Sequence, residues 1–198
     1  MTRARDLASL GDNTSKLEQQ GLVQVIPTSV TVGSGSGSVN SKGTISLSGV
    51  SSAKINGCFS STYDNYKITV AGLNTATTGI AGISFRFVKS TVESTSNYFY
   101  TFIYAGNSGG PSRTYAGSQS IWSAGALGDY ESSVIWDIIE PFKAASRTNY
   151  YGNYTGVAST NNEMGIVNGF HTLTDSYDGF SFSCGTFTGT IRVYGYNQ

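Results

Sequence analysis

The stretch Ile83-Ser-Phe-Arg-Phe-Val88 decides the fold class. Bulky apolar side chains alternate with polar ones, with Phe85 and Phe87 on one face and Arg86 on the other, which is typical of a half-buried β-strand. Similar segments are 44–48, 53–60, 66–71, 97–104, 133–140, 150–155, 166–173, 179–184 and 190–196. Gly and Asn separate them, and no strand–helix alternation is visible. The pattern predicts an all-β, antiparallel, jelly-roll-like β-sandwich over residues 43–198, with about eight to ten strands.

Charged residues are scarce in this chain of 198 residues. It has 12 Lys+Arg and 12 Asp+Glu, so its formal net charge is zero, and its 12% charged residues are about half the usual fraction. A nucleic-acid binder usually carries a basic excess, and a His-based zinc site needs more than one His. We therefore expect no nucleic-acid partner, no metal and no cofactor. Two cysteines, Cys58 and Cys184, are too few for a disulfide scaffold; they either pair or are small buried apolar residues.

The first 21 residues are unusually rich in charge, since residues 1–18 hold 6 of the 24 charged side chains. Ala4, Leu7 and Ala8 recur at helical spacing, and Gly11 is a typical stop signal. A short isolated helix is only marginally stable in water, so we predict that 1–21 form a helical segment that docks onto another protein. A frayed terminus is the alternative. The predicted docking residues are Arg3, Arg5, Asp6, Leu7, Leu10 and Leu17.

Residues 22–42 combine a short apolar strand before Pro27 with the run Gly33-Ser-Gly-Ser-Gly-Ser38. Such a run is typical of a flexible linker, and it lacks the Lys and the helix that a phosphate-binding loop needs. We predict a linker between the docking segment and the body. An edge strand rich in small residues is the alternative.

No segment of the sequence has the length of an export signal or a membrane span. A signal needs about 7–15 apolar residues after its basic start, and a spanning helix needs about 20. We expect a protein without a signal peptide that is made in a cytoplasm and does not insert into a membrane. Exposure outside the cell would then require transport on a particle.

No constellation of catalytic residues is evident, so we expect a protein that is not an enzyme. His171 has no serine in a nucleophile-elbow context to act on. Four carboxylates, Asp129, Glu131, Asp137 and Glu140, lie within twelve residues. Glu131 and Asp137 are an even number of positions apart and can share a strand face, as a glycosidase pair requires. Solvated surface charge is the simpler interpretation.

Tyrosine is the most informative residue type, with 13 Tyr against 2 Trp. Tyrosine has a flat apolar face and a polar tip, and tyrosines beside Gly, Ser and Asn resemble binding loops on a rigid sandwich. Sugar rings stack on such side chains. The alternative is that these residues pack the core or a subunit interface. The predicted receptor-binding residues are Tyr115, Trp122, Tyr130, Tyr150, Tyr151 and Tyr154.

Four stretches resemble small tail-fibre or minor tail proteins of tailed bacteriophages. They are Thr2-Arg-Ala-Arg-Asp-Leu-Ala8, Val32-Gly-Ser-Gly-Ser-Gly-Ser-Val39, Ile55-Asn-Gly-Cys-Phe-Ser-Ser-Thr-Tyr-Asp-Asn-Tyr66 and Gly185-Thr-Phe-Thr-Gly-Thr-Ile-Arg-Val-Tyr-Gly-Tyr196. The resemblance spans nearly the whole chain. It implies a virion component, often trimeric, with a docking N-terminus and a distal jelly-roll-like body. It supplies no catalytic residues.

The leading hypothesis is therefore a receptor-binding tail-fibre or minor tail protein. Its N-terminus would dock onto other virion proteins, and its body would recognise a host surface receptor, either a glycan or a protein. The many tyrosines and the weak self-repulsion of a neutral chain favour a homotrimer. A capsid decoration or head-fibre protein is a structural alternative, and a polysaccharide depolymerase that uses Glu131 and Asp137 is an enzymatic one.

Overall fold

The computed structural model describes residues 21–75, 78–107 and 109–196, and all of its regular elements are β-strands. Every strand pairing in these ranges is antiparallel, which confirms the predicted all-β class. No helix in this part of the chain could cross a membrane. Residues 1–20 of the predicted helical docking segment lie outside the described residues, and with them Arg3, Arg5, Asp6, Leu7, Leu10 and Leu17.

Fourteen strands are found in the described ranges, more than the sequence pattern predicts. They are β1 (Leu22–Val25), β2 (Ser29–Val32), β3 (Ser36–Val39), β4 (Ile45–Asn56), β5 (Asn65–Asn74), β6 (Ala81–Lys89), β7 (Val92–Glu93), β8 (Tyr98–Gly106), β9 (Gly109–Gln119), β10 (Trp122–Leu127), β11 (Ser132–Ile139), β12 (Thr148–Gly156), β13 (Glu163–His171) and β14 (Gly179–Tyr196). The additional strands are mainly β2, β3, β9 and β10. β3 and β9 are rich in Gly and Ser and lack a clear apolar alternation, β10 has small residues at most of its positions, and β2 alternates but is only four residues long.

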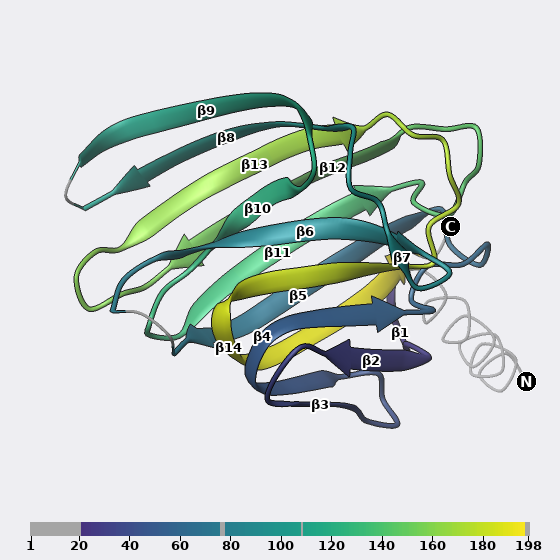
Figure 1. The fold of residues 1–198 in the computed structure, drawn as a ribbon, viewed down its shortest axis with the longest axis horizontal. Coiled ribbons are helices and arrows are strands. Elements are labelled where there is room, and N and C mark those ends of the chain that lie inside the picture. Colours follow the sequence, from purple (N-terminus) through teal and green to yellow (C-terminus); the bar gives the residue numbers. More distant parts are fainter. Residues whose placement is uncertain (1–20, 76–77, 108, 197–198) are drawn as a thin grey trace, which may run out of the picture.

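The strands form two packed layers that share two long strands. The larger layer has the order β9-β8-β13-β12-β11-β5 and continues into the second half of β14. The smaller layer has the order β10-β6 and continues into the first half of β14. β4 pairs with both halves of β14, β1 pairs with the end of β14, and β2 and β3 pair with β4. Figure 1 shows the smaller layer in front of the larger one, which is the arrangement of an antiparallel β-sandwich.

A sharp bend at Gly185 carries β14 from one layer into the other, as the yellow ribbon in Figure 1 shows. Gly185 has a φ of 53°, a left-handed conformation that glycine adopts without steric cost. A Cβ at this position would lie 2.8 Å from Asn74 Oδ1, which accepts a hydrogen bond of 3.0 Å from the backbone N–H of Thr186. The bend therefore requires glycine. Because β14 bends here, the two layers form one continuous hydrogen-bonded sheet.

Aromatic rings from the two layers meet in the core. The ring centroids of Phe85 in β6 and Trp136 in β11 are 5.5 Å apart, and those of Trp122 in β10 and Tyr150 in β12 are 4.1 Å apart. All four side chains are at most 1% exposed. Full burial of a large apolar side chain contributes about 1.5–3 kcal/mol, and a ring pair adds about 0.5–1.5 kcal/mol. These contacts hold the two layers together.

The Gly/Ser segment belongs to the sandwich, so the prediction of a linker within 22–42 was wrong. β2 and β3 lie in this segment and both pair with β4. Gly37 of β3 faces Leu47, and a Cβ at Gly37 would lie 2.7 Å from Val32 Cγ1. The small residues therefore allow a close approach of neighbouring strands. The alternative, an edge strand rich in small residues, is what the structure shows.

The two cysteines are free thiols, and each is 1% exposed. Burial raises the pKa of Cys184 to about 12 and raises the pKa of Cys58 still further. Both thiols are therefore protonated at neutral pH. The interpretation of these cysteines as small buried apolar residues is confirmed.

Candidate binding face

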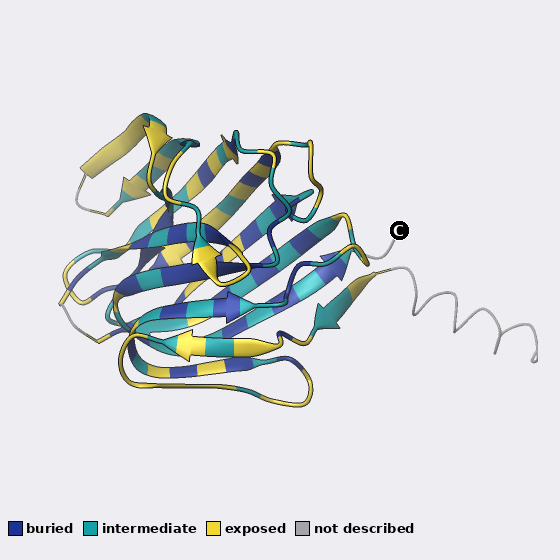
Figure 2. Cartoon of the chain, turned by 45° about the vertical axis from the view of Figure 1, so that its right-hand side comes forward, coloured by how far each residue is buried: buried dark blue, intermediate teal, exposed yellow. Residues whose placement is uncertain are grey.

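The outer face of the larger layer is formed by every second residue of its strands. In β11, Val134 and Trp136 are buried in the core, whereas Ile135 between them is 38% exposed. The strand register places Ile166 of β13 and Ile103 of β8 in the same cross-strand row as Ile135. Figure 2 shows this alternation as buried and exposed bands along the strands. We call the outward-facing residues of β5, β11, β12, β13, β8 and β9 the outer face.

Large apolar and aromatic side chains are concentrated on the outer face. Eleven such side chains are exposed in the described ranges, and seven of them lie here. Soluble proteins rarely expose a large contiguous apolar patch unless a partner covers it. The outer face is therefore the candidate binding surface. The seven are Ile103, Tyr115, Ile135, Tyr151, Met164, Ile166 and Phe170.

One half of the outer face is aliphatic. It consists of Ile103, Ile135, Met164 and Ile166, which come from β8, β11 and β13. Three of them, together with Pro111 of β9, line a shallow depression of about 490 Å³. A second depression of about 550 Å³ adjoins it over β5, β11 and β14, with a floor rich in Ser, Thr and Gly.

The other half of the outer face is aromatic and polar. Tyr151 of β12, 46% exposed, and Tyr115 of β9, 76% exposed, belong to one cross-strand row. Asn168 of β13 and Thr101 of β8 lie between them in that row. We call these four residues the tyrosine row. Neither Asn168 nor Thr101 has a side-chain hydrogen bond to another residue in the described ranges, so both polar groups are available to a ligand.

A stacked pair of rings borders the tyrosine row. Phe99 of β8 and Phe170 of β13 have ring centroids 5.0 Å apart and an interplanar angle of 7°. This pair, with Thr101, Tyr115 and Asn168, lines a depression of about 280 Å³. The depression combines flat apolar walls with a few polar groups, which is the usual composition of a small-ligand site.

The two charged residues that continue the tyrosine row onto β11 and β5 neutralise each other. Lys67 Nζ of β5 lies 2.8 Å from Asp137 Oδ1 of β11, and the hydroxyl of Tyr196 also donates to that carboxylate. Partial burial lowers the pKa of Lys67, but its hydrogen bonds to Asp137 and Tyr196 outweigh this effect and leave the pKa raised. Lys67 therefore stays charged, and the cluster presents little net charge to a partner.

The structure separates the six predicted receptor-binding residues into two groups. Trp122, Tyr150 and Tyr154 are at most 3% exposed and belong to the core, so their prediction as surface contacts was wrong. Glycines on β13 make room for two of these rings: a Cβ at Gly169 would lie 2.4 Å from Tyr150, and a Cβ at Gly165 would lie 2.5 Å from Tyr154.

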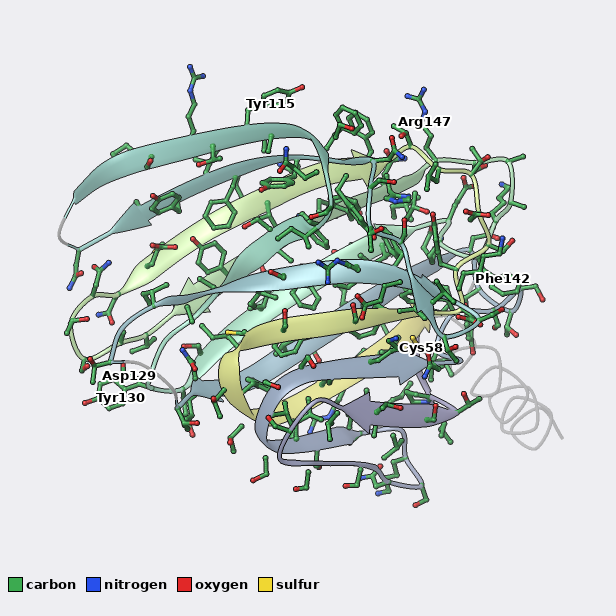
Figure 3. All side chains as sticks on the ribbon, in the orientation of Figure 1. Cys58, Tyr115, Asp129, Tyr130, Phe142 and Arg147 are labelled. Carbon is green, nitrogen blue, oxygen red and sulfur yellow. The ribbon has the colours of Figure 1, made fainter. Side chains whose placement is uncertain are left out.

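The other three predicted tyrosines are exposed. Tyr115 and Tyr151 lie on strands of the outer face and not in loops. Tyr130 is 55% exposed and lies in the turn between β10 and β11, far from Tyr115 (Figure 3). We therefore leave Tyr130 out of the candidate site.

Four residues of the site were missed by the sequence prediction: Phe99, Thr101, Asn168 and Phe170. Their segments were predicted as strands, and the alternation within each strand placed them on one side. The sequence does not reveal the strand order, which places β8 beside β13 and β13 beside β12 and so brings these residues together.

The acidic residues do not form a catalytic pair. Asp137 is engaged by Lys67, and Glu131 lies six residues before it on the same face, which corresponds to about 20 Å along an extended strand. A glycosidase pair needs a separation of about 5–9.5 Å. The carboxylate of Asp129 accepts hydrogen bonds from the N–H and hydroxyl of Ser159, and Glu140 pairs with Lys143.

His171 is fully buried and has hydrogen-bond partners on both ring nitrogens. Nδ1 lies 3.0 Å from the Tyr177 hydroxyl, and Nε2 lies 2.9 Å from the carbonyl oxygen of Ser96. Burial lowers the pKa of His171, which favours the neutral ring. His171 is therefore a buried residue whose hydrogen bonds are satisfied within the protein. In the described part of the chain, no group of three or more His, Cys, Asp or Glu residues could hold a metal ion.

No family model and no curated protein matches the chain. The similar solved structures include the SPRY domain of human HERC1, with 8% identity, a TM-score of 0.39 and coverage of 88% of this chain and 99% of that domain. Domain 4 of AbnA, a GH43 extracellular arabinanase from Geobacillus stearothermophilus in complex with arabinotriose, has 11% identity, a TM-score of 0.32 and coverage of 89% and 93%. The CBM2 module of the evolved Dit of Lactobacillus casei BL23 phage J-1 has 8% identity, a TM-score of 0.30 and coverage of 90% and 98%. At such TM-scores the likeness supports no functional conclusion, so we rely on the geometry of the outer face.

Proposed function

We propose that this chain is a non-enzymatic binding protein that recognises a glycan on a host-cell surface. The tyrosine row carries the proposal: two exposed tyrosines flank an amide and a hydroxyl that have no side-chain partner, and all four lie on paired strands. Tyrosine faces stack on sugar rings, and amide and hydroxyl groups exchange hydrogen bonds with sugar hydroxyls. A site on strands is held more rigidly than one on loops.

We further propose that the protein is a receptor-binding component of a bacteriophage tail. This part of the proposal is supported by the resemblance of the sequence to tail-fibre and minor tail proteins. Residues 1–21 would dock the chain onto other virion proteins, and the sandwich would face the host. Deleting residues 1–21 should then leave a folded, glycan-binding body that no longer joins virions. Continued incorporation of the truncated chain would contradict the docking role.

The proposed assembly is a homotrimer in which the aliphatic half of the outer face contacts a neighbouring copy. Ile103, Met164 and Ile166 are 42–62% exposed, and oligomer interfaces are richer in apolar residues than the remaining surface. Light scattering should give three times the mass of the chain for the wild type. Ile166→Ser should shift the protein towards the monomer, whereas a monomeric wild type at micromolar concentration would exclude the trimer.

The glycan-binding role is tested by binding of the purified full chain to host cells. We expect Tyr151→Ala to reduce binding strongly and Tyr130→Ala to leave it unchanged. The two substitutions remove the same side chain from similarly exposed positions, of which only one lies on the outer face. Equal binding by both variants would exclude the outer face as the recognition site. Release of soluble sugar by the wild type would show that the protein is a depolymerase.

A further inference from the structure

The tyrosine row has a defined length and direction. Tyr151 pairs with Asn168, Asn168 pairs with Thr101, and Thr101 pairs with Tyr115, so the row crosses four adjacent strands at right angles to the chain direction. Neighbouring strands are about 4.8 Å apart, and three such steps place the two tyrosine positions about 14 Å apart. This span is longer than a disaccharide.

The two ends of the row offer flat rings, and the middle offers hydrogen bonds. Tyr151 and Tyr115 are the two exposed aromatic side chains in the row, while Asn168 and Thr101 between them are polar. A path along β12 itself meets no second ring, because the outward neighbours of Tyr151 on its own strand are Asn149 and Asn153. A ligand that uses both rings must therefore lie across the strands.

The charge of the row indicates the charge of its ligand. The row contains no Asp, Glu, Lys or Arg, and the next residues of the same row beyond Tyr151 are Asp137 and Lys67, which neutralise each other. Arg113 of β9 lies one row away, opposite Ile103. A polyanion would find no array of cations here, whereas a neutral chain loses less hydration free energy on burial than a charged one.

We infer that the tyrosine row binds a neutral, linear oligosaccharide that runs across the strands and spans four or more sugar units. One sugar ring stacks on Tyr151, a ring several units away stacks on Tyr115, and Asn168 and Thr101 exchange hydrogen bonds with the hydroxyl groups between them. This inference rests on the proposed function, because it specifies the ligand of the same face. It adds the class, the minimum length and the direction of the glycan.

The test measures the affinity of the full chain for cello-, malto- and chito-oligosaccharides of two to six units, with sulfated oligosaccharides as charged probes. For a neutral series that binds, we expect the affinity to rise roughly tenfold or more between two and four units, a factor that corresponds to about 1.4 kcal/mol, and then to level off. Binding should change little between 50 mM and 500 mM salt.

Variants locate the two ends of the ligand. Tyr151→Ala and Tyr115→Ala should each lower the affinity for the hexasaccharide roughly tenfold, while Tyr151→Phe, which keeps the ring, should retain most of it. For a disaccharide, the loss should be small for at least one of the two alanine variants. Tyr130→Ala is the matched control and should bind like the wild type. Thermal unfolding of each variant separates lost binding from lost folding.

The outcomes separate this inference from the proposed function. Binding of a disaccharide and a hexasaccharide with equal affinity, or dependence on only one tyrosine, would overturn the extended ligand and leave a glycan-binding face in place. Preference for the sulfated probes with a steep loss in salt would overturn the neutral ligand and point to Arg113. Failure to bind any oligosaccharide and any host-cell glycan would overturn both.

Discussion

The two outer faces of the sandwich are built by the same alternation and share one core, yet they carry different side chains. The smaller layer presents short hydroxyls and paired charges: Arg86 Nη1 lies 3.1 Å from Glu93 Oε2, and Arg86 Nε donates to the carbonyl oxygen of Ser120 at 3.0 Å. The larger layer presents Ile, Met, Tyr and Phe. Stability does not require this difference, because either face could be covered with Ser and Thr. This difference is what we expect if the larger layer, as proposed, contacts a ligand and a neighbouring copy while the smaller layer faces solvent.

The largest effect should come from the core that the two faces share. Phe85→Ala removes a fully buried ring that contacts Trp136 and Trp122, and such truncations cost about 3–5 kcal/mol. Both tryptophans remain as fluorescence reporters in chemical denaturation. We expect a single transition at lower denaturant concentration, because the bent β14 joins both layers. Two separate transitions would show that the faces unfold independently.

The ion pairs of the two faces should differ in strength. The side chains of Lys67 and Asp137 are 23% and 15% exposed, and Tyr196 adds a further hydrogen bond, so Asp137→Ala should cost about 1.5–3 kcal/mol. Glu93→Ala on the smaller layer removes a more exposed partner of Arg86 and should cost about 1 kcal/mol or less. Urea denaturation of both variants gives the comparison. Equal losses would mean that the cluster of Lys67, Asp137 and Tyr196 stabilises the protein no more than an ordinary surface ion pair does.

Acid should destabilise the end of the larger layer that His171 holds. Burial lowers the pKa of His171 in the folded protein, so the unfolded chain binds the proton more readily. The contribution of His171 to the free energy of unfolding should therefore be fully present above the ordinary histidine pKa of about 6.5. It should decrease as the pH falls below that value. Thermal unfolding between pH 7.5 and 5 measures this slope. In His171→Gln the stability should depend less on pH over this range. An unchanged pH dependence would show that the carboxylates cause it.

The smallest effect on stability should come from the site itself. Tyr151 and Tyr115 are 46% and 76% exposed, so replacing either with Ala should change the free energy of unfolding by about 0.5 kcal/mol or less. Ser183→Ala on the smaller layer should be equally neutral for stability. Only the tyrosine variants should lose ligand binding. If a tyrosine variant lost both stability and ligand binding, the tyrosine ring would contribute to packing as well.

Particular residues show how far the sequence alone could predict this protein. The alternation at 83–88 gave the strand and its buried face correctly, because periodicity is a local property. Tyr150 and Tyr151 are adjacent, yet one lies in the core and the other on the surface. Their assignment depends on Gly169, which faces Tyr150 across a strand pairing that the sequence does not reveal. The tyrosine row likewise joins β12, β13, β8 and β9, whose neighbourhood follows from the strand order and not from any motif.

The attachment of β1 to the end of β14 has a mechanical consequence. β1 pairs with the part of β14 that belongs to the larger layer, the same layer that carries the tyrosine row. If the proposed docking and glycan-binding roles hold, tension between an anchor before Leu22 and a ligand on the outer face can pass through β1 and β14 from strand to strand within the larger layer, without crossing the aromatic core. Resistance to forced unfolding depends on the rate at which the weakest ladder opens, and β1, with four residues, is the ladder we expect to separate first.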